Sequence, residues 1–323
     1  MKSIKIEKFG GPEVLKIQDV EVGKPGPKEV LIKNNSIGLN FIDIYHRTGL
    51  YPIPLPSGIG LEACGQIEEV GSEVSLFKVG DRVTHASMPI GAYSEKQVMP
   101  EEKLVLVPEG ISDEVASCIT LKGITAEYLL HRAYPLKKGD KVLYHAAAGG
   151  VGQILCQWAN SLGAEVIGTV GSKEKEAIAK KNGCHHVINY TDQNFVEEVE
   201  KIVGKNGIDV VYDGVGIKTF DGSIETLKIR GMMVAFGNAS GYVDTIDVKK
   251  HINAKGLFFT RPSIAHYTIT REELVESAKK VFDAILSEKF KVEISKKYSL
   301  NEAKKAHEEL EARLLMGPAV IIP

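Results

Sequence analysis

The sequence lacks a surplus of either charge and lacks any long apolar run. Its 40 basic and 42 acidic residues give a formal net charge of -2, which offers no bulk attraction to nucleic acid or to an anionic membrane. No stretch approaches the roughly 18 apolar residues that span a bilayer, and residues 1–9 alternate charged and apolar side chains. We therefore expect a cytoplasmic protein with neither a nucleic-acid nor a membrane partner.

Cysteine is scarce, and the spacing of its four copies excludes two classes of site. Cys64, Cys118, Cys156 and Cys184 are far apart in the chain. A disulfide framework or a metal clip normally brings cysteines together at short, recurring spacings. We expect all four to be reduced and mostly buried, as small apolar side chains.

The length and the hydrophobic pattern of the chain indicate two domains. Its 323 residues exceed the usual size of one compact core, and 43% of them are hydrophobic. Short alternating runs, such as residues 30–33 and 65–70, are broken by glycine and proline over the first third. From about residue 125, helical patterns alternate with short apolar runs. The fold class predicted is α/β, with a β-rich domain and a doubly wound parallel sheet.

The second region repeats a strand–helix unit. Residues 141–145 predict a strand, and a glycine-rich turn and a helix ending at Gly163 follow it. Further strands are predicted over residues 165–170, 187–190, 208–213 and 232–237, with a possible edge strand at 257–260. This repetition is typical of a Rossmann sheet.

The C-terminal part is predicted to return to the first domain. Thr270 with Glu273, and Ser299 with Glu302, form capping boxes that predict helix starts. Residues 319–322 predict a last strand that could pair with the β-rich domain. The predicted domains are therefore a discontinuous one, residues 1–124 and 266–323, and a dinucleotide-binding one, residues 125–265.

The glycine-rich turn at residues 146–152 carries the most chemistry. Glycines in such a turn let the backbone approach a pyrophosphate, which the free amides and the helix dipole stabilise. Gly149 and Gly152 fill the second and third glycine positions of the dinucleotide motif, whereas Ala147 stands at the first. Such a turn could simply join a strand to a helix, but the repeated strand–helix units around it favour a nucleotide.

The end of the second predicted strand favours NADPH over NADH. An acid about 20 residues after the turn would bind the ribose of NAD. Val170 stands there instead, followed by Ser172 and Lys175, which can donate hydrogen bonds to a 2′-phosphate. The alternative is that Lys173 and Lys175 are ordinary solvated lysines on a helix.

Several segments together resemble the quinone oxidoreductase branch of the medium-chain dehydrogenase/reductase superfamily, the zeta-crystallin-like enzymes. The resemblance extends over the whole chain and is carried by residues 40–43, 80–83, 121–123, 146–152, 156–159 and 236–241. It implies a GroES-like β-rich barrel completed by the C-terminal segment, a central Rossmann domain, and a homodimer formed through the Rossmann domains.

The sequence departs from the zinc-dependent relatives. Asn40 stands where those enzymes have their first catalytic cysteine, and Leu61–Glu62 replaces the usual His-Glu pair. We expect no metal site, because zinc needs three or four closely placed ligands. Without a Lewis acid, a readily reduced quinone or conjugated carbonyl is the expected substrate, and no indispensable acid or base is expected, so the sequence assigns no catalytic residue.

The resemblance also implies positions for site residues. Tyr45 and Tyr51 are expected at the substrate pocket, although a surface loop explains Tyr51 equally well. The aromatic members of the cofactor set have ordinary core packing as their alternative, most of all Phe236 and Phe259. The residues expected to contact the cofactor are Asn40, Tyr45, Tyr128, Gly149, Gly150, Val151, Gly171, Ser172, Lys175, Tyr190, Phe236, Gly237, Asn238, Phe259 and Arg313.

Two other functions fit the same sequence. An alkenal or enone reductase shares this scaffold and differs in the shape of its pocket. A structural or RNA-binding role, as among zeta-crystallin relatives, is the alternative from another class, and the absence of a basic stripe and the intact cofactor turn weigh against it.

Overall fold

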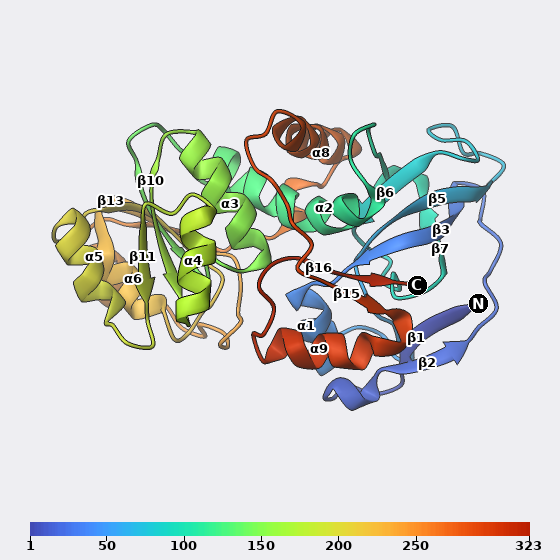
Figure 1. Ribbon diagram of the computed structural model, residues 1–323, viewed down its shortest axis with the longest axis horizontal. Coiled ribbons are helices and arrows are strands. Elements are labelled where there is room, and N and C mark those ends of the chain that lie inside the picture. Colours follow the sequence, from blue (N-terminus) through green and yellow to red (C-terminus); the bar gives the residue numbers. More distant parts are fainter. The chain divides into compact units, whose positions relative to one another are not determined.

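The computed structural model describes residues 1–323, and these residues form two units. Unit 1 contains Met1–Ile124, Thr268–Leu286 and Val292–Pro323, and unit 2 contains Thr125–Tyr267 and Ser287–Lys291. The chain thus leaves the first unit, builds the second and returns (Figure 1).

Unit 1 is built mainly from two sheets. The larger has the order β15-β16-β3-β5-β6-β8, with β7 also paired to β3, and the smaller has the order β2-β1-β4. Its strands are β1 (Lys2–Ile6), β2 (Lys16–Asp19), β3 (Glu29–Gly38), β4 (Ser57–Gly58), β5 (Glu62–Val70), β6 (Arg82–Ala86), β7 (Lys96–Pro100), β8 (Val105–Leu106), β15 (Lys296–Ser299) and β16 (Ala319–Ile322). Its helices are α1 (Phe41–Thr48), most of α2 (Asp113–Tyr128), α8 (Arg271–Leu286) and α9 (Ala303–Glu311), with short turns η1 (Pro12–Val14), η2 (Glu101–Lys103) and η5 (Leu300–Glu302).

The C-terminal segment completes the core of unit 1. The last strand, β16, pairs antiparallel with β3 and parallel with β15. Ile321 and Tyr298 are buried with Ile4 and Ile37 from the start of the chain. The late helix α9, drawn in red, lies beside the early helix α1, drawn in blue (Figure 1). The folded unit therefore needs both ends of the sequence.

Unit 2 is a six-stranded parallel sheet with the order β11-β10-β9-β12-β13-β14. Its strands are β9 (Lys141–His145), β10 (Glu165–Val170), β11 (His186–Asn189), β12 (Ile208–Asp213), β13 (Leu227–Ala235) and β14 (Phe258–Thr260). Its helices are α3 (Gly150–Ser161), α4 (Lys173–Lys181), α5 (Phe195–Val203), α6 (Phe220–Thr226) and α7 (Ile264–Tyr267), with π-helical turns η3 (Leu129–Ala133) and η4 (Val248–Asn253). This order, third-second-first-fourth-fifth-sixth along the unit, is that of a Rossmann sheet, which places the switch point between β9 and β12.

The apolar runs of unit 2 form a core on one face of its sheet. Leu143, Ile167, Val211 and Met233 come from four neighbouring strands and are buried together. Phe220 of α6 packs into the same cluster. Because all six strands are parallel, the residues after each strand gather along one edge of the sheet, and the glycine-rich turn follows the central strand β9.

Two short segments differ from the predicted domain boundaries. Residues 266–267 and Ser287–Lys291, which the sequence assigned to the first domain, belong to unit 2. The Phe290 ring lies 5.4 Å from the Trp158 ring, and the Lys291 backbone exchanges two hydrogen bonds with the Gln157 side chain. These contacts lie far from residues 287–291 in sequence, so the local pattern gave no sign of them.

Candidate functional site

The glycine-rich turn of unit 2 is held by close backbone contacts. A Cβ atom at Gly152 would lie 2.6 Å from the carbonyl oxygen of Ala146 and 2.7 Å from that of Ala147. Only glycine lets α3 begin this close to the turn. The N–H groups of the first turn of α3, from Gly150 onward, have no carbonyl partner within their own helix. They form the kind of anion site that a pyrophosphate occupies.

The turn contains one feature that the sequence did not indicate. Ala146 has a φ of +62°, in the left-handed region that favours glycine, whereas Gly149 has a φ of -76°. A residue with a side chain costs roughly 1–3 kcal/mol in such a conformation. The strain therefore lies one residue before Ala147, the position that replaces the first glycine of the motif.

The expected 2′-phosphate region follows β10. Ser172 is the N-cap of α4, where its hydroxyl accepts a hydrogen bond from the Lys175 amide at 3.4 Å. A Cβ atom at Gly171 would lie 2.5 Å from the Tyr190 hydroxyl oxygen, so Tyr190 lies directly against the Gly171 backbone. The structure brings these four residues together at the start of a helix, and no acid follows Val170 until Glu174.

The other predicted residues of unit 2 lie in three places. The Tyr128 ring stacks on Tyr267 with centroids 4.5 Å apart. Gly237 packs so closely that a Cβ atom would lie 2.4 Å from the Gly214 carbonyl oxygen, and Asn238 beside it is buried. Phe259 lies on β14 and faces Phe220 of the core at 6.2 Å, and Phe236 lies 6.1 Å from Tyr144. Both phenylalanines are half-buried, and Phe259 packs against the core of unit 2.

Four predicted residues belong to unit 1. Tyr45 and Tyr51 form an edge-to-face pair with centroids 5.1 Å apart, and Tyr45 also contacts Phe41. Arg313 follows α9, is exposed and has a φ of +58°. Asn40, which precedes α1, is buried. Tyr45 and Tyr51 thus lie side by side.

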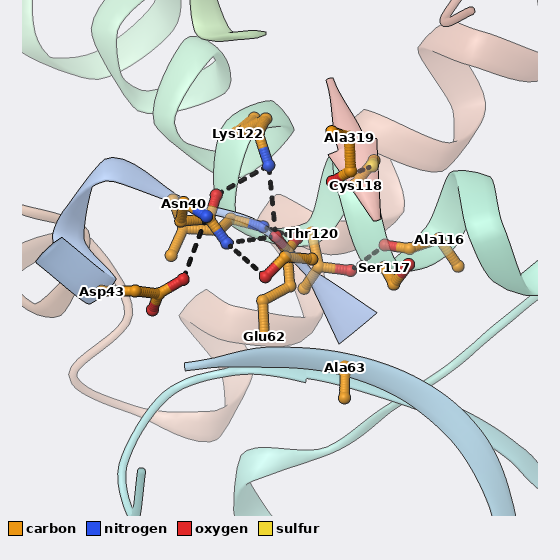
Figure 2. Close-up of polar contacts among 12 residues, drawn as sticks. Asn40, Asp43, Glu62, Ala63, Ala116, Ser117, Cys118, Thr120, Lys122 and Ala319 are labelled. Carbon is orange, nitrogen blue, oxygen red and sulfur yellow. Dashed lines mark hydrogen bonds and ion pairs between the residues drawn. The ribbon is translucent and has the colours of Figure 1, made fainter. Parts of the chain in front are cut away.

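Asn40 belongs to a buried cluster of charged side chains. Its Nδ2 donates to Glu62 Oε2 at 2.8 Å and to the Gly38 carbonyl at 3.3 Å. Its Oδ1 accepts a hydrogen bond of 2.7 Å from Lys122 Nζ. Figure 2 shows the three side chains pointing toward one another from β5, α2 and the start of α1. Because an ammonium can only donate, these contacts fix the orientation of the amide.

Both oxygens of the Glu62 carboxylate accept hydrogen bonds. Oε1 accepts the Leu121 amide at 2.6 Å, and Oε2 lies 3.5 Å from Lys122 Nζ. Burial raises the pKa of Glu62 above its usual value, and the Lys122 charge with the hydrogen bonds from Leu121 and Asn40 oppose that rise. The paired ammonium makes a buried carboxylate tolerable at this place.

A second acid, Asp43 of α1, lies beside this cluster. Its Oδ2 accepts the Asn40 amide at 3.0 Å and the Tyr93 hydroxyl at 2.9 Å. Its Oδ1 is buried and has no hydrogen-bond partner. Burial raises the pKa of Asp43 to about 7, against the lowering effect of these bonds and of Lys122.

A chain of donors fixes the Tyr93 hydroxyl. The Arg47 guanidinium donates to His307 Nδ1 at 3.1 Å, and His307 Nε2 lies 3.1 Å from the Tyr93 oxygen. Burial, with the Arg47 charge, lowers the pKa of His307 to about 3, so the ring is neutral near pH 7. Since Nδ1 accepts from Arg47, Nε2 carries the hydrogen and donates to Tyr93. The Tyr93 hydrogen is therefore directed at Asp43.

Asp43, Glu62 and Lys122 had no predicted role in the site. Each is a charged residue between apolar or small neighbours: Asp43 in Ile-Asp-Ile, Glu62 in Leu-Glu-Ala and Lys122 in Leu-Lys-Gly. A charge inside an apolar run indicates a buried, paired side chain, and that signal was available. Their mutual distances were not, because the partners are 22 and 82 residues from Asn40 in sequence.

Comparison with known proteins gives the class first. The family model for the alcohol dehydrogenase GroES-like domain matches residues 26–133, and the model for zinc-binding dehydrogenases matches residues 150–286. Together with the Rossmann strand order, these matches define a medium-chain dehydrogenase/reductase and confirm the predicted fold class.

The relatives narrow the class to one branch. A quinone oxidoreductase of Pseudomonas aeruginosa is 46% identical over 100% of this chain and 99% of its own. A 2-haloacrylate reductase of a Burkholderia species is 45% identical over 98% of both chains. The crystal structure of Escherichia coli quinone oxidoreductase complexed with NADPH superposes with a TM-score of 0.97 at 44% identity over all of both chains. This chain belongs to the quinone oxidoreductase branch of the medium-chain dehydrogenase/reductase superfamily, as its sequence predicted.

The zinc in the name of the matching family does not fit these residues. The chain has no group of three or more histidine, cysteine, aspartate and glutamate side chains arranged to hold a metal ion. Leu61 stands at the position of the histidine ligand, and Asn40, at the position of the first cysteine ligand, is bonded to Glu62 and to the Lys122 ammonium. All four cysteines are free and buried, as expected, and no helix has the length and apolarity to cross a membrane.

Proposed function

We propose that this protein is an NADPH-dependent, metal-independent reductase of quinones. The observation that carries the cofactor part is the start of α4, where the Ser172 hydroxyl accepts the Lys175 amide and the Tyr190 hydroxyl lies against the Gly171 backbone. Val170 occupies the position at which an NAD-binding protein has an acid. A carboxylate there would repel a 2′-phosphate, whereas a hydroxyl and an ammonium can bind it. The NADPH bound to the Escherichia coli relative supports this proposal.

The residues of unit 2 fit a dinucleotide. The backbone of Gly149, Gly150 and Val151 would hold the pyrophosphate, and Gly171, Ser172, Lys175 and Tyr190 the 2′-phosphate. The cofactor, when bound, supplies hydride to the substrate. As further contacts we keep Tyr128, Phe236, Gly237, Asn238 and Phe259 of unit 2, with Asn40, Tyr45 and Arg313 of unit 1.

The substrate is proposed from its chemistry. A quinone accepts hydride without a Lewis acid, so the chain mainly has to hold it and exclude water. Tyr45 and Tyr51, which form one aromatic pair, are the residues proposed to contact the ring. The name of the Pseudomonas aeruginosa relative supports a quinone.

A conjugated carbonyl compound is the second candidate, favoured by one observation. The 2-haloacrylate reductase is as similar to this chain as several quinone oxidoreductases are. A haloacrylate has a carbon–carbon double bond next to a carboxyl group, so hydride adds to carbon. The same cofactor position would serve both substrates.

Turnover of the purified full chain separates the candidates. NADPH oxidation would be followed by absorbance with a small 1,4-quinone, with 2-chloroacrylate and with an enone. We expect quinone-dependent oxidation of NADPH. If 2-chloroacrylate or the enone is reduced and the quinone is not, the second candidate is favoured. Failure to bind NADPH would contradict both candidate functions.

The protein is further proposed to be a cytoplasmic homodimer. In unit 2, β14 forms an open edge of the sheet, and its Phe258 is 58% exposed. Ile229 of β13 is 68% exposed. An open strand edge flanked by exposed apolar side chains is suited to pairing with a second copy of itself.

A further inference from the structure

Lys122 has more hydrogen-bond donors than partners. Its side chain lies on α2, and the residue is only 5% exposed. Of the three N–H bonds of its ammonium, one points to Asn40 Oδ1 at 2.7 Å and one can serve Glu62 Oε2 at 3.5 Å (Figure 2). The third has no acceptor in the chain. A buried charged donor is costly to leave unpaired, so such a donor normally meets water or a ligand.

The neighbours of Lys122 hold it without competing for a ligand. Both hydrogens of the Asn40 amide are taken, by Gly38 and Glu62, and both oxygens of Glu62 accept hydrogen bonds. The Asn40 amide cannot donate to an incoming group without losing a bond that it has now, and the Glu62 carboxylate can only accept. The ammonium is the group of this cluster that can still donate.

A donor of this kind favours a ligand oxygen that gains negative charge during the reaction. An N–H donor fixed in a poorly hydrated place stabilises developing charge strongly, because little reorganisation is needed when the charge appears. Glu62 already balances the charge of Lys122, so the cluster attracts a fully charged ligand weakly and still offers a directed hydrogen bond. That combination favours a neutral carbonyl oxygen which gains charge during the reaction.

We propose that Lys122 is a catalytic residue of the reduction proposed above, and that its ammonium donates a hydrogen bond to the substrate carbonyl oxygen. Asn40 and Glu62 act as positioning residues for it. The substrate gains a hydride, that is two electrons and one proton, and the nicotinamide cofactor is the species oxidised. The negative charge then rests on the substrate oxygen, where the ammonium stabilises it. One proton from water neutralises that oxygen, and Lys122 keeps its three protons.

The first test needs no turnover. The probe is 4-nitrophenol, whose coloured anion resembles the anion formed when a quinone accepts hydride. The absorbance of this anion would be followed as the pH is varied, in the presence of the full chain and NADP⁺. We expect the pKa of the bound 4-nitrophenol to lie about one unit or more below that of free 4-nitrophenol, because the ammonium stabilises the phenolate. Lys122→Met should abolish the shift.

The second test uses steady-state kinetics with NADPH and a 1,4-quinone. Lys122→Met should lower kcat by roughly 10²- to 10³-fold, as for the loss of one oxyanion donor, with a smaller change in KM. Because that substitution leaves Glu62 buried without its partner, the double variant Lys122→Met with Glu62→Gln serves as a folded alternative. Lys33→Met, at an exposed lysine of the same unit, is the matched control.

The outcomes separate this proposal from the proposed function. If kcat with the quinone in both Lys122 variants stays within about threefold of the wild-type value, the role of Lys122 is overturned and the reductase function is left intact. A probe shift that persists in those variants would also overturn it. The wild-type protein could instead lower the pKa of the probe, in a way that depends on Lys122, and yet not oxidise NADPH with any acceptor. That result would support Lys122 as a hydrogen-bond donor and contradict the proposed reductase function.

Discussion

Tyr93 and Asp43 lie 2.9 Å apart between hydroxyl and carboxyl oxygens, and the other carboxyl oxygen of Asp43 has no partner. The Tyr93 hydrogen points at Asp43 because His307, which accepts a hydrogen bond from Arg47, donates to the Tyr93 oxygen. These bonds favour the ionised carboxyl, yet burial outweighs them and raises the pKa of Asp43 to about 7. Burial of this acid therefore makes the stability of unit 1 depend on pH.

Asp43→Asn tests that balance, because asparagine imitates the protonated acid. The pKa of Asp43 is raised from 3.8 to about 7 in the folded chain. The stabilising effect of the bound proton is therefore complete below about pH 4 and is lost as the pH rises to 7. The variant should resemble the wild type near pH 4 and exceed it by up to about 4 kcal/mol at pH 8.

Urea unfolding at a series of pH values measures this difference. Asp19→Asn, at an exposed aspartate of the same unit, is the control for the effect of the substitution itself. A flat difference for Asp43→Asn would show that the Asp43 carboxyl ionises as it does in water.

Gly152→Ala tests the close start of α3. The new Cβ atom would lie 2.6 to 2.8 Å from backbone atoms of Ala146 and Ala147, which cannot move without distorting the turn. We expect the free energy of unfolding to fall by about 1–3 kcal/mol and NADPH affinity to fall at least about tenfold. Gly23→Ala is the control, because a Cβ atom there meets nothing within 4 Å. Calorimetric titration with unchanged NADPH affinity would show that the turn does not hold the cofactor.

Lys175→Ala tests cofactor preference. If Lys175 binds the 2′-phosphate, the variant should lose most of its preference for NADPH over NADH while binding NADH as before. Each tenfold change in that ratio corresponds to about 1.4 kcal/mol, an ordinary size for a charge-assisted hydrogen bond. Lys180→Ala removes an exposed lysine from the other end of the same helix and should change neither affinity. Equal losses for both cofactors would instead indicate damage to the fold.

Phe258→Arg tests the proposed dimer. A charge on the exposed side of the edge strand β14 should oppose pairing with a second copy, so the variant should sediment as a monomer where the wild type sediments as a dimer. Val79→Arg, at a residue of unit 1 that is equally exposed at 58%, is the control. An unchanged dimer of Phe258→Arg would place the interface elsewhere.

Much of unit 2 could be predicted because its signals are local. A strand, a glycine turn and an amphipathic helix recur within about 30 residues, and β9, β10 and β12 have the predicted bounds. The third strand is shifted by one residue, to His186–Asn189, and β13 begins five residues earlier than predicted, at Leu227. Pairing with β12 and β14 decides these ends, and such pairing is invisible in a short window.

The sequence by itself determined the family, the two kinds of domain, the glycine turn and the missing acid at Val170, because these depend on residue types at short spacings. Tertiary structure alone decided that Lys122 meets Asn40 and Glu62, that Asp43 is buried beside Tyr93, and that residues 287–291 join unit 2. Tyr93 and His307 are 214 residues apart. Contacts over such separations arise from the packing of whole elements, and that packing, not the local pattern, sets the burial that raises the pKa of Asp43.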